Sequence, residues 1–520
     1  MTNNENGIAT ASPLDSIYGE NPLLDPLGPR ISFQHLPHRL INRPLEGCEL
    51  ARLDASAREE LLVLYEQNFV PTTSGINIVA ALQNLHREHY WHRHPANPKA
   101  RRDRFQIAQF TKSKDFDSAS VPWLSTSARG MIIKGITGTG KSAITNRYTD
   151  LLSQQICEHA NGVIPGFEYV RQLSWIKVDM SNDGSRDGFL TSILMEVDRL
   201  IDTNYAKQYS GRFSIDKLAI VVGVILSTHL CGMLIIEEIQ EKNFNNSKWR
   251  SQLTTFFLRI LNFGIPIVLI GNPLGFTELE KSSQNIRRLS SGGVFEMLPS
   301  LNGADDDFQN IVEHTLSFNI MERQNEQAHE YFRDVAFCYS GGITDFVVRL
   351  NTESQLIALR SGKSEVLPKH INAAFLSSRM VANHPLINGL VNRDPNILRT
   401  CNDVPVERFL EIWLTEKQPY ETTGTKSGAI PDQSPEGTKI SPGAGNIEDK
   451  SSSKIERSAP PLSEHPVAKR LKAEQTRKTN RQKKAVEKKE KLGPDDIRGD
   501  GVGATLIAGL KDLLNPKKLT

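Results

Sequence analysis

The stretch from Met131 to Ile144 has the sequence MIIKGITGTGKSAI, and it decides the fold. An apolar run leads into a loop with the spacing GxxxxGK[ST]. Glycines in such a loop let backbone N–H groups converge on phosphates at a helix N-terminus, while the lysine adds positive charge and the hydroxyl ligates Mg²⁺. The stretch therefore predicts a strand, a phosphate-binding loop and a helix. The loop consists of Gly135, Ile136, Thr137, Gly138, Thr139, Gly140, Lys141 and Ser142.

Further apolar runs predict the rest of a sheet. With MIIKG they are LSWIKVDM at 173–180, GMLIIEE at 232–238, PIVLIGN at 266–272 and VFEML at 294–298. The first four are nearly continuous apolar runs, as expected for strands buried on both faces of a parallel sheet that helices cover. Residues 300–415 lack such runs and predict a helical lid. The fold class is therefore α/β.

Two acidic residues end the third run. Glu237 and Glu238 lie 96 and 97 residues after Lys141. We expect Glu237 to orient the Mg²⁺ shell and Glu238 to polarise the attacking water as general base. Position 237 usually carries Asp, and Glu is one methylene longer, which bears on Mg²⁺ geometry and on the hydrolysis rate. The alternative is a pair of surface glutamates that cap a strand.

A polar residue ends the fourth run. Asn272 is expected at a sensor position, in contact with the γ-phosphate and the water, although a turn residue is the alternative. The run at 173–180 lies between the phosphate loop and the acidic run along the chain, which favours the additional-strand class of NTPases. We therefore predict an AAA+ P-loop ATPase. ATP is favoured over GTP because no [NT]KxD base-reading motif follows.

Three arginines are candidates for contacts with the nucleotide. Arg287 and Arg288 lie in a polar segment between the fourth and fifth runs, from which an arginine often reaches the active site of a neighbouring subunit. That role requires an oligomer, and an exposed helix surface is the alternative. Arg349, in SGGITDFVVRL, is a weaker candidate for an arginine of the lid that senses nucleotide.

A segment before the phosphate loop is dense in histidine and arginine. The arginines would repel a cation and no cysteine lies nearby, so the pattern disfavours a zinc site. Contact with phosphates and a solvated basic surface remain as alternatives. The residues are His86, Arg87, His89, His92, Arg93, His94, Arg101, Arg102 and Arg104.

Composition limits the classes of protein. The chain has 520 residues, 38% of them hydrophobic, which is enough for at least one large core. Its five cysteines are scattered without a CxxC pair, so neither a disulfide framework nor a zinc ribbon is indicated. No apolar run approaches the length of a membrane span, and the N-terminus lacks a signal-peptide pattern. We expect a protein of the cytosol.

The C-terminal part contains a basic block followed by a short segment with apolar residues. Residues 469–491 carry eleven Lys/Arg against three Asp/Glu, a net +8, so the rest of the chain carries −6 of the overall +2. Such a block suits nucleic acid or a solvated disordered segment. Apolar residues at 505–514 predict a short amphipathic helix that docks on a partner or folds back.

The predicted organisation has five parts. They are an N-terminal arm with a helical and basic segment (1–105), the ATPase core (106–299), the lid (300–415), a flexible linker (416–465), and a disordered basic tail with a docking helix (466–520).

Several segments also occur together in one known family. They are YGENPLLDPL at 18–27, NFVP at 68–71, the phosphate loop, the run from Leu173 to Tyr209, LIIEEIQ, GIPIVLIGNP, the double arginine and SGGITDFVVRL. In this order they resemble the TnsC regulators of heteromeric transposons. The resemblance covers most of residues 15–350, and the C-terminal PDDIRGDGVGATLIAGLKDLL is similar more weakly.

This resemblance implies a regulator of DNA transposition. Such a protein assembles with ATP on double-stranded DNA as a homo-oligomeric ring or filament and links a target-selection protein to the endonuclease and integrase-like subunits of the transposase. Loops after the second and third strands would follow the DNA backbone, with Arg186, Lys242 and Lys248 as candidates. The alternatives are a replication initiator of the same superfamily and a signalling ATPase that binds no DNA.

Overall fold

The computed structural model describes residues 15–417, apart from 115, 118, 119, 123, 125–127 and 183. The predictions for the linker and the basic tail therefore lie outside the described residues, except for two linker positions at the end of the last helix. The docking helix expected at 505–514 lies outside them as well.

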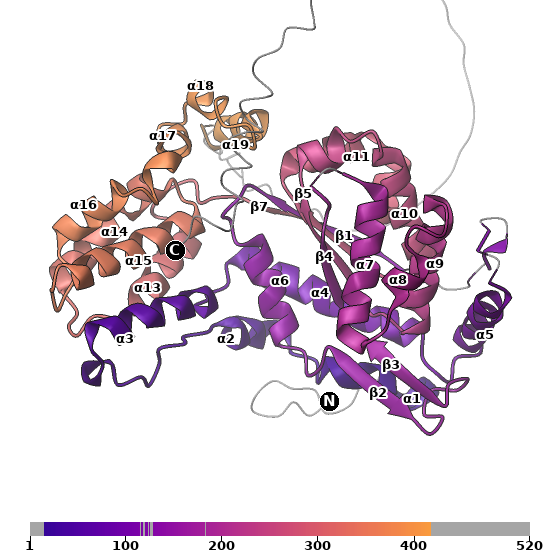
Figure 1. The fold of residues 1–520 in the computed structure, drawn as a ribbon. Helices are drawn as coiled ribbons and strands as arrows, with labels where there is room; N and C mark the ends of the chain where they lie inside the picture. Colours follow the sequence, from indigo (N-terminus) through magenta and orange to yellow (C-terminus); the bar gives the residue numbers. More distant parts are fainter. Residues whose placement is uncertain are drawn as a thin grey trace, which may run out of the picture. The chain divides into compact units, whose positions relative to one another are not determined.

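A five-stranded parallel sheet with helices on both faces forms the centre of the chain, as the apolar runs predict (Figure 1). Its strand order is β4-β5-β6-β1-β7. The strands are β1 (Gly130–Gly135), β4 (Ile176–Asp179), β5 (Leu234–Ile239), β6 (Ile267–Gly271) and β7 (Val294–Met297). Since β1 pairs with both β6 and β7, the phosphate loop starts from the interior of the sheet.

The spatial order of the strands differs from their order along the chain. The run at 173–180 is split, because Leu173 ends β3 (Tyr169–Leu173) and Ile176 begins β4. β3 pairs with β2 (Ile156–Ala160) in an antiparallel hairpin that the sequence analysis did not predict. β4 lies at the edge of the sheet beyond β5, and β6 is the strand inserted between β1 and β5.

Each face of the sheet is covered by its own helices. Ile132, Ile236 and Leu269 pack with α7, α9 and α10 in the largest apolar cluster, whereas Ile133 and Ile235 pack with α4 and α6 on the other face. This alternation explains why the strands are apolar throughout. The helices are α4 (Thr73–His92), α6 (Lys141–Asp150), α7 (Arg186–Ile201), α9 (Ile215–Thr228) and α10 (Arg250–Asn262).

The N-terminal arm docks on this core. Leu23 and Leu27 of a 3-10 turn at Pro22–Leu27 are buried against Tyr90 and Leu230. Further along, Arg58 forms an ion pair with Glu322 at 3.0 Å. The short helices of this part are α1 (Asp15–Tyr18), α2 (Leu36–Leu40), α3 (Ala55–Glu60) and a 3-10 helix at Leu61–Gln67, and α5 (Pro98–Ser113) follows α4.

The described residues after 300 form helices and no strand, as the sequence predicts. α13 (Asp306–Ser317), α14 (Glu326–Ser340), α15 (Thr344–Arg360) and α16 (Pro368–Phe375) share one apolar cluster. A second cluster joins α17, α18 and α19 with Ile136 of the phosphate loop. These three helices are α17 (His384–Val391), α18 (Pro395–Leu398) and α19 (Val406–Lys417). The remaining short helices are α8 (Tyr205–Tyr209), α11 (Pro273–Lys281) and α12 (Ser283–Leu289).

The segment rich in histidine and arginine is largely buried, which corrects both alternatives left open for it. His86 contacts the Tyr148 hydroxyl at 3.0 Å and the Ser174 carbonyl at 2.7 Å. His89 contacts the Cys231 carbonyl at 3.2 Å, and Arg93 donates to the Ser227 carbonyl at 3.2 Å. Buried carbonyls that no strand pairs with need a donor, and α4 supplies it.

The remaining residues of this segment either contact backbone carbonyls or are exposed. His94 contacts the Gly19 carbonyl at 3.2 Å, and Arg104 donates to the Pro95 carbonyl at 3.1 Å. Arg87 donates to the Gly28 carbonyl. Only His92, Arg101 and Arg102 of the nine residues are exposed. The segment therefore serves mainly to fasten α4 to the core.

Two further findings concern the chain as a whole. Within the described ranges, no helix is long and apolar enough to cross a membrane. The same residues contain no group of three His, Cys, Asp or Glu side chains placed to hold a metal ion.

The buried histidines predict acid sensitivity. Burial lowers the pKa of His86 from 6.5 to about 3. Between these two pH values the imidazole is protonated in the unfolded chain and neutral in the folded chain. Each such proton lowers the free energy of unfolding by about 1.4 kcal/mol per pH unit. Stability is therefore fully present above pH 6.5 and is lost as the pH falls toward 3.

Urea unfolding from about pH 7.5 to 5 measures this slope. His86→Gln keeps a donor toward Ser174 and should flatten the slope by about one proton. The control is His92→Gln, because His92 is exposed and pairs with Glu88. An unchanged slope in His86→Gln would contradict the assignment.

Candidate functional site

The phosphate loop joins β1 to α6 with two residues in the left-handed region. Gly138 has φ +87° and Gly140 has φ +90°. A Cβ at Gly138 would lie 2.9 Å from a methyl of Ile343 in the lid, so a side chain has neither the conformation nor the room. The glycine spacing thus lets the loop turn tightly beneath the lid and enter α6 with its N–H groups free for anions.

Lys141 begins α6 and bends back over the loop. Its ammonium donates to the Ile136 carbonyl at 2.9 Å, and the Thr139 hydroxyl donates to the same carbonyl at 2.9 Å. Burial lowers the pKa of Lys141, and the carboxylates of Glu238, Glu237 and Asp403 act in the opposite direction. Three carboxylates therefore favour the charged form of the one lysine of the loop.

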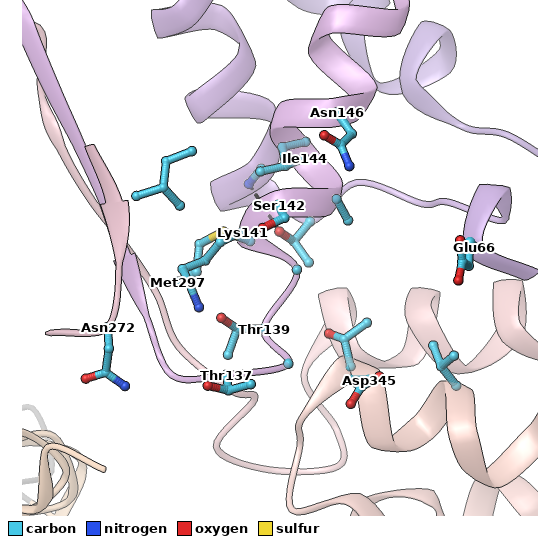
Figure 2. A pocket seen from close by; sticks show the side chains of 18 of the residues that line it. Glu66, Thr137, Thr139, Lys141, Ser142, Ile144, Asn146, Asn272, Met297 and Asp345 are labelled. Atoms are coloured by element: carbon cyan, nitrogen blue, oxygen red, sulfur yellow. Dashed lines mark hydrogen bonds between the residues drawn. The ribbon is translucent and has the colours of Figure 1, made fainter. Parts of the chain in front are cut away.

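A cavity of about 1050 Å³ opens around the loop (Figure 2). Thr137 to Ser142 form one wall, and Glu238 and Asn272 line it from the ends of β5 and β6. Figure 2 shows the loop between Asn272 on one side and Asp345 of the lid on the other. The structure thus brings together, in one cavity, residues that the sequence placed more than 130 positions apart.

Glu237 stays within the sheet, beside this cavity. It is 6% exposed, and its Oε1 accepts a hydrogen bond from the Thr145 hydroxyl at 3.2 Å. Its Oε2 pairs with the Lys177 ammonium at 3.0 Å, and Lys177 also donates to Asn146 at 2.5 Å. Groups from α6 and β4 therefore fix both oxygens of the longer side chain.

The sequence analysis did not assign a role to Lys177. Its signal is the spacing in IKVD, because Asp179 is in register with Glu237 on the neighbouring strand and Lys177 precedes it by two residues. Residues two apart on a strand share a face, so Lys177 lies on the face that Glu237 occupies.

Glu238 lies at an irregularity of β5. Its φ is +56°, and the register between β5 and β6 shifts between Ile236 and Ile239. Asn243 holds the Glu238 carbonyl at 2.8 Å, and Gln240 donates to the carboxylate at 2.8 Å. A residue other than glycine in this conformation costs about 1 kcal/mol, and the bulge that requires it re-aims the side chain. Adjacent glutamates thus occupy different environments, one buried and one lining the cavity.

Ser142 and Glu237 suit a magnesium ion. Both offer oxygen atoms, the ligands that Mg²⁺ prefers. A carboxylate has about four lone-pair positions, and protein groups use two of those on Glu237. Ser142 therefore offers an oxygen inside the cavity, and Glu237 offers its remaining lone pairs from beside it.

Asn272 has the contacts of a turn residue and also lines the cavity. Its side-chain oxygen accepts from the Leu274 N–H at 2.9 Å and caps α11, as a turn residue would. Its amide nitrogen donates to the Asp403 carbonyl at 2.6 Å and has a second hydrogen, on a side chain that lines the cavity.

The candidate arginines lie outside the cavity. Arg288, in α12, donates to Asn262 at 2.5 Å. Arg287 is exposed, and no described residue hydrogen-bonds to its side chain or forms an ion pair with it. Arg349 pairs with Asp345 at 2.7 Å, whereas Arg379, which the sequence analysis did not single out, lines the cavity from the lid.

The DNA candidates differ in exposure. Arg186 lies over the ring of Trp249 at 4.6 Å, pairs with Asp216 at 3.5 Å and has a side chain only 15% exposed. Lys248 is exposed and lies 5.0 Å from the same ring. Lys242 is exposed and lines the cavity. Arg186 is therefore held within the protein, and the two lysines are displayed.

An apolar part of the cavity was also not predicted. Phe69 and Val70 of the N-terminal part meet Ile311 and Val348 of the lid there. NFVP at 68–71 was the only signal for it in the sequence. Such a pocket suits the flat apolar faces of a nucleotide base.

One protein-family model matches the central part of the chain. Residues 125–279 match the sequence model of the family described as AAA domain. This segment carries the phosphate loop, the acidic pair and Asn272, and its fold is that of an AAA+ P-loop protein. No curated protein sequence matches the chain.

Three solved structures are similar at low identity. The Aeropyrum pernix ORC1 protein in complex with DNA has 16% identity and a TM-score of 0.35, over 61% of this chain and 79% of that chain. The Drosophila ORC bound to DNA has 13% identity and a TM-score of 0.33, over 65% and 84%. The Thermotoga maritima RuvB Holliday junction branch migration motor has 12% identity and a TM-score of 0.30, over 60% and 76%.

Removing the loop lysine tests the site. Lys141→Ala should weaken binding of a fluorescent adenine nucleotide at least about tenfold, because a charge-assisted contact to phosphate is lost. The control is Lys134→Ala, which removes a lysine from β1 that pairs with Glu280 at 2.7 Å outside the loop. Equal affinity in the two variants would show that the loop does not bind the phosphates.

Proposed function

We propose that this protein is an ATPase that assembles on double-stranded DNA and regulates DNA transposition. The observation that carries the ATPase is the single cavity in which the phosphate loop, Glu238 and Asn272 meet. The transposition role rests on the resemblance of the sequence to TnsC regulators.

The side chains around the cavity have separate roles in ATP hydrolysis. Lys141 and the N–H groups at the start of α6 neutralise and orient the phosphates. Glu238 accepts the proton of the attacking water, and Asn272 directs its second amide hydrogen at the γ-phosphate or that water. Ser142 and Glu237 would hold Mg²⁺, which would supply neutralisation of phosphate charge.

Lys177 and Thr145 keep Glu237 in place. Because Lys177 and Thr145 bind both oxygens of Glu237, its carboxylate is held in place. The Glu238 carboxylate is then the one that acts on water. The bulge at Glu238 supports the same division, because Glu238 lines the cavity while Glu237 stays in the sheet beside it. The Glu that replaces the usual Asp is thus compatible with turnover.

The position of Arg287 supports an oligomer. It is exposed on α12 and lies outside its own cavity, so it is available to a neighbouring subunit. Arg288 is engaged with Asn262 and is the weaker candidate. The site of each subunit would then be complete only in a homo-oligomeric ring or filament.

Lys242 and Lys248 support binding to the DNA backbone. Both are exposed in the polar loop after β5, and contacts of this kind are independent of base sequence and weaken with salt. By the resemblance, the assembled protein receives a target-selection protein and activates the endonuclease and integrase-like subunits of the transposase.

Glu238→Gln tests the hydrolytic mechanism. The variant keeps a hydrogen-bonding group of the same size but cannot accept the proton, so ATP turnover should fall about 100-fold or more while nucleotide affinity changes little. The measurement is phosphate release together with equilibrium binding. Glu168→Gln, which changes an exposed glutamate that does not line the cavity, serves as the control. Undiminished turnover in Glu238→Gln would remove Glu238 from the mechanism.

Assembly on DNA tests the wider proposal. With duplex DNA and a non-hydrolysable ATP analogue, electron microscopy should show ordered oligomers that are absent for Lys141→Ala. Arg287→Ala should lower turnover per subunit by about 1000-fold if it acts in trans, and Arg288→Ala much less. Nucleotide binding without any association with DNA would instead favour a signalling ATPase.

A further inference from the structure

A short segment of the C-terminal part reaches the phosphate loop. We call residues 402–405, which lead from α18 to α19, the strap. Asn402 and Asp403 line the same cavity as the loop, about 265 residues away along the chain. The Asp403 carboxylate accepts a long hydrogen bond from the Thr137 hydroxyl at 3.4 Å, and its carbonyl accepts from Asn272 at 2.6 Å.

Apolar contacts fasten the strap and α19 to the loop. Val404, Val406 and Phe409 share one buried cluster with Ile136, which is 2% exposed within the loop itself. Arg408 of α19 pairs with Glu296 of β7 at 2.8 Å. We therefore expect any displacement of the strap to displace α19 as well.

The negative charge of Asp403 lies beside Thr137 of the phosphate loop. Its carboxylate acts on the Lys141 ammonium together with Glu237 and Glu238. It also contacts Thr137, in the part of the loop whose N–H groups point at phosphate in proteins with this spacing. Asp403 accepts hydrogen bonds from both the Thr137 hydroxyl of the loop and the Asn272 amide, whereas no described hydrogen bond joins Glu237 or Glu238 to either residue.

We propose that Asp403 is an internal anion that competes with the terminal phosphate of ATP, and that its displacement by ATP moves the strap and α19. This latch rests on the proposed ATPase function. Two like charges a few ångströms apart repel strongly in a partly buried site, so the carboxylate and the γ-phosphate exclude each other. ADP has no γ-phosphate and leaves the strap in place.

The latch connects the nucleotide to the end of the chain. α19 is the last described helix, and residues 418–520 follow it directly. Those residues include the basic block and the predicted docking helix.

Nucleotide affinities of the full-length chain test the competition. Asp403→Asn removes the charge and keeps the shape, so the Kd for a non-hydrolysable ATP analogue should fall about tenfold and that for ADP less than about twofold. The matched control is Glu407→Gln, which removes an exposed acid from the first turn of α19 where it pairs with Arg399. An equal or weaker affinity of Asp403→Asn for the ATP analogue overturns the proposal.

Hydrogen exchange of α19 tests the movement. In the wild type, the amides of Val406–Lys417 should exchange at least about threefold faster with the ATP analogue than with ADP. Equal exchange in the two nucleotides overturns the latch.

The two experiments together separate the latch from the ATPase proposal. If the wild type binds neither nucleotide, the proposed ATPase function fails and the latch with it. If the wild type binds both, and Asp403→Asn has wild-type affinities, only the latch fails.

Discussion

The pairing of β1 with two parallel neighbours is the constraint on which the site depends. β1 hydrogen-bonds to β6 on one side and to β7 on the other, and β6 in turn pairs with β5. Because parallel strands end at the same edge, the phosphate loop, Asn272 and the two glutamates converge there without any long side chain reaching across. The burial of both faces by separate groups of helices keeps this edge fixed.

At that edge, a local difference in backbone conformation places two neighbouring carboxylates in different environments. Glu237 and Glu238 are neighbours in the chain, yet Glu237 is held by Lys177 and Thr145 while Glu238 turns out at φ +56°. The extra methylene of Glu237 is accommodated because partners from two elements fix its carboxylate. Strain at Glu238 is tolerated because Asn243 and Gln240 hold its carbonyl and carboxylate.

Segments far apart in the sequence complete the cavity. Phe69 and Val70 close it from the N-terminal side, Ile311 and Val348 from the lid, and the strap from the C-terminal side. Under the proposed function, one bound nucleotide would lie next to the N-terminal part, the lid and the strap.

The sequence by itself determined the parallel sheet, the phosphate loop and the lid, because burial on both faces and the need for glycine at Gly138 and Gly140 leave local patterns. Only the tertiary structure decided the roles of Lys177, the strap and the histidines of α4. Lys177 pairs with a residue of the neighbouring strand, Asp403 makes a contact across 266 residues, and His86 contacts the carbonyl of Ser174, 88 residues away. Contacts of this kind depend on which elements are adjacent in space, and no local pattern encodes that.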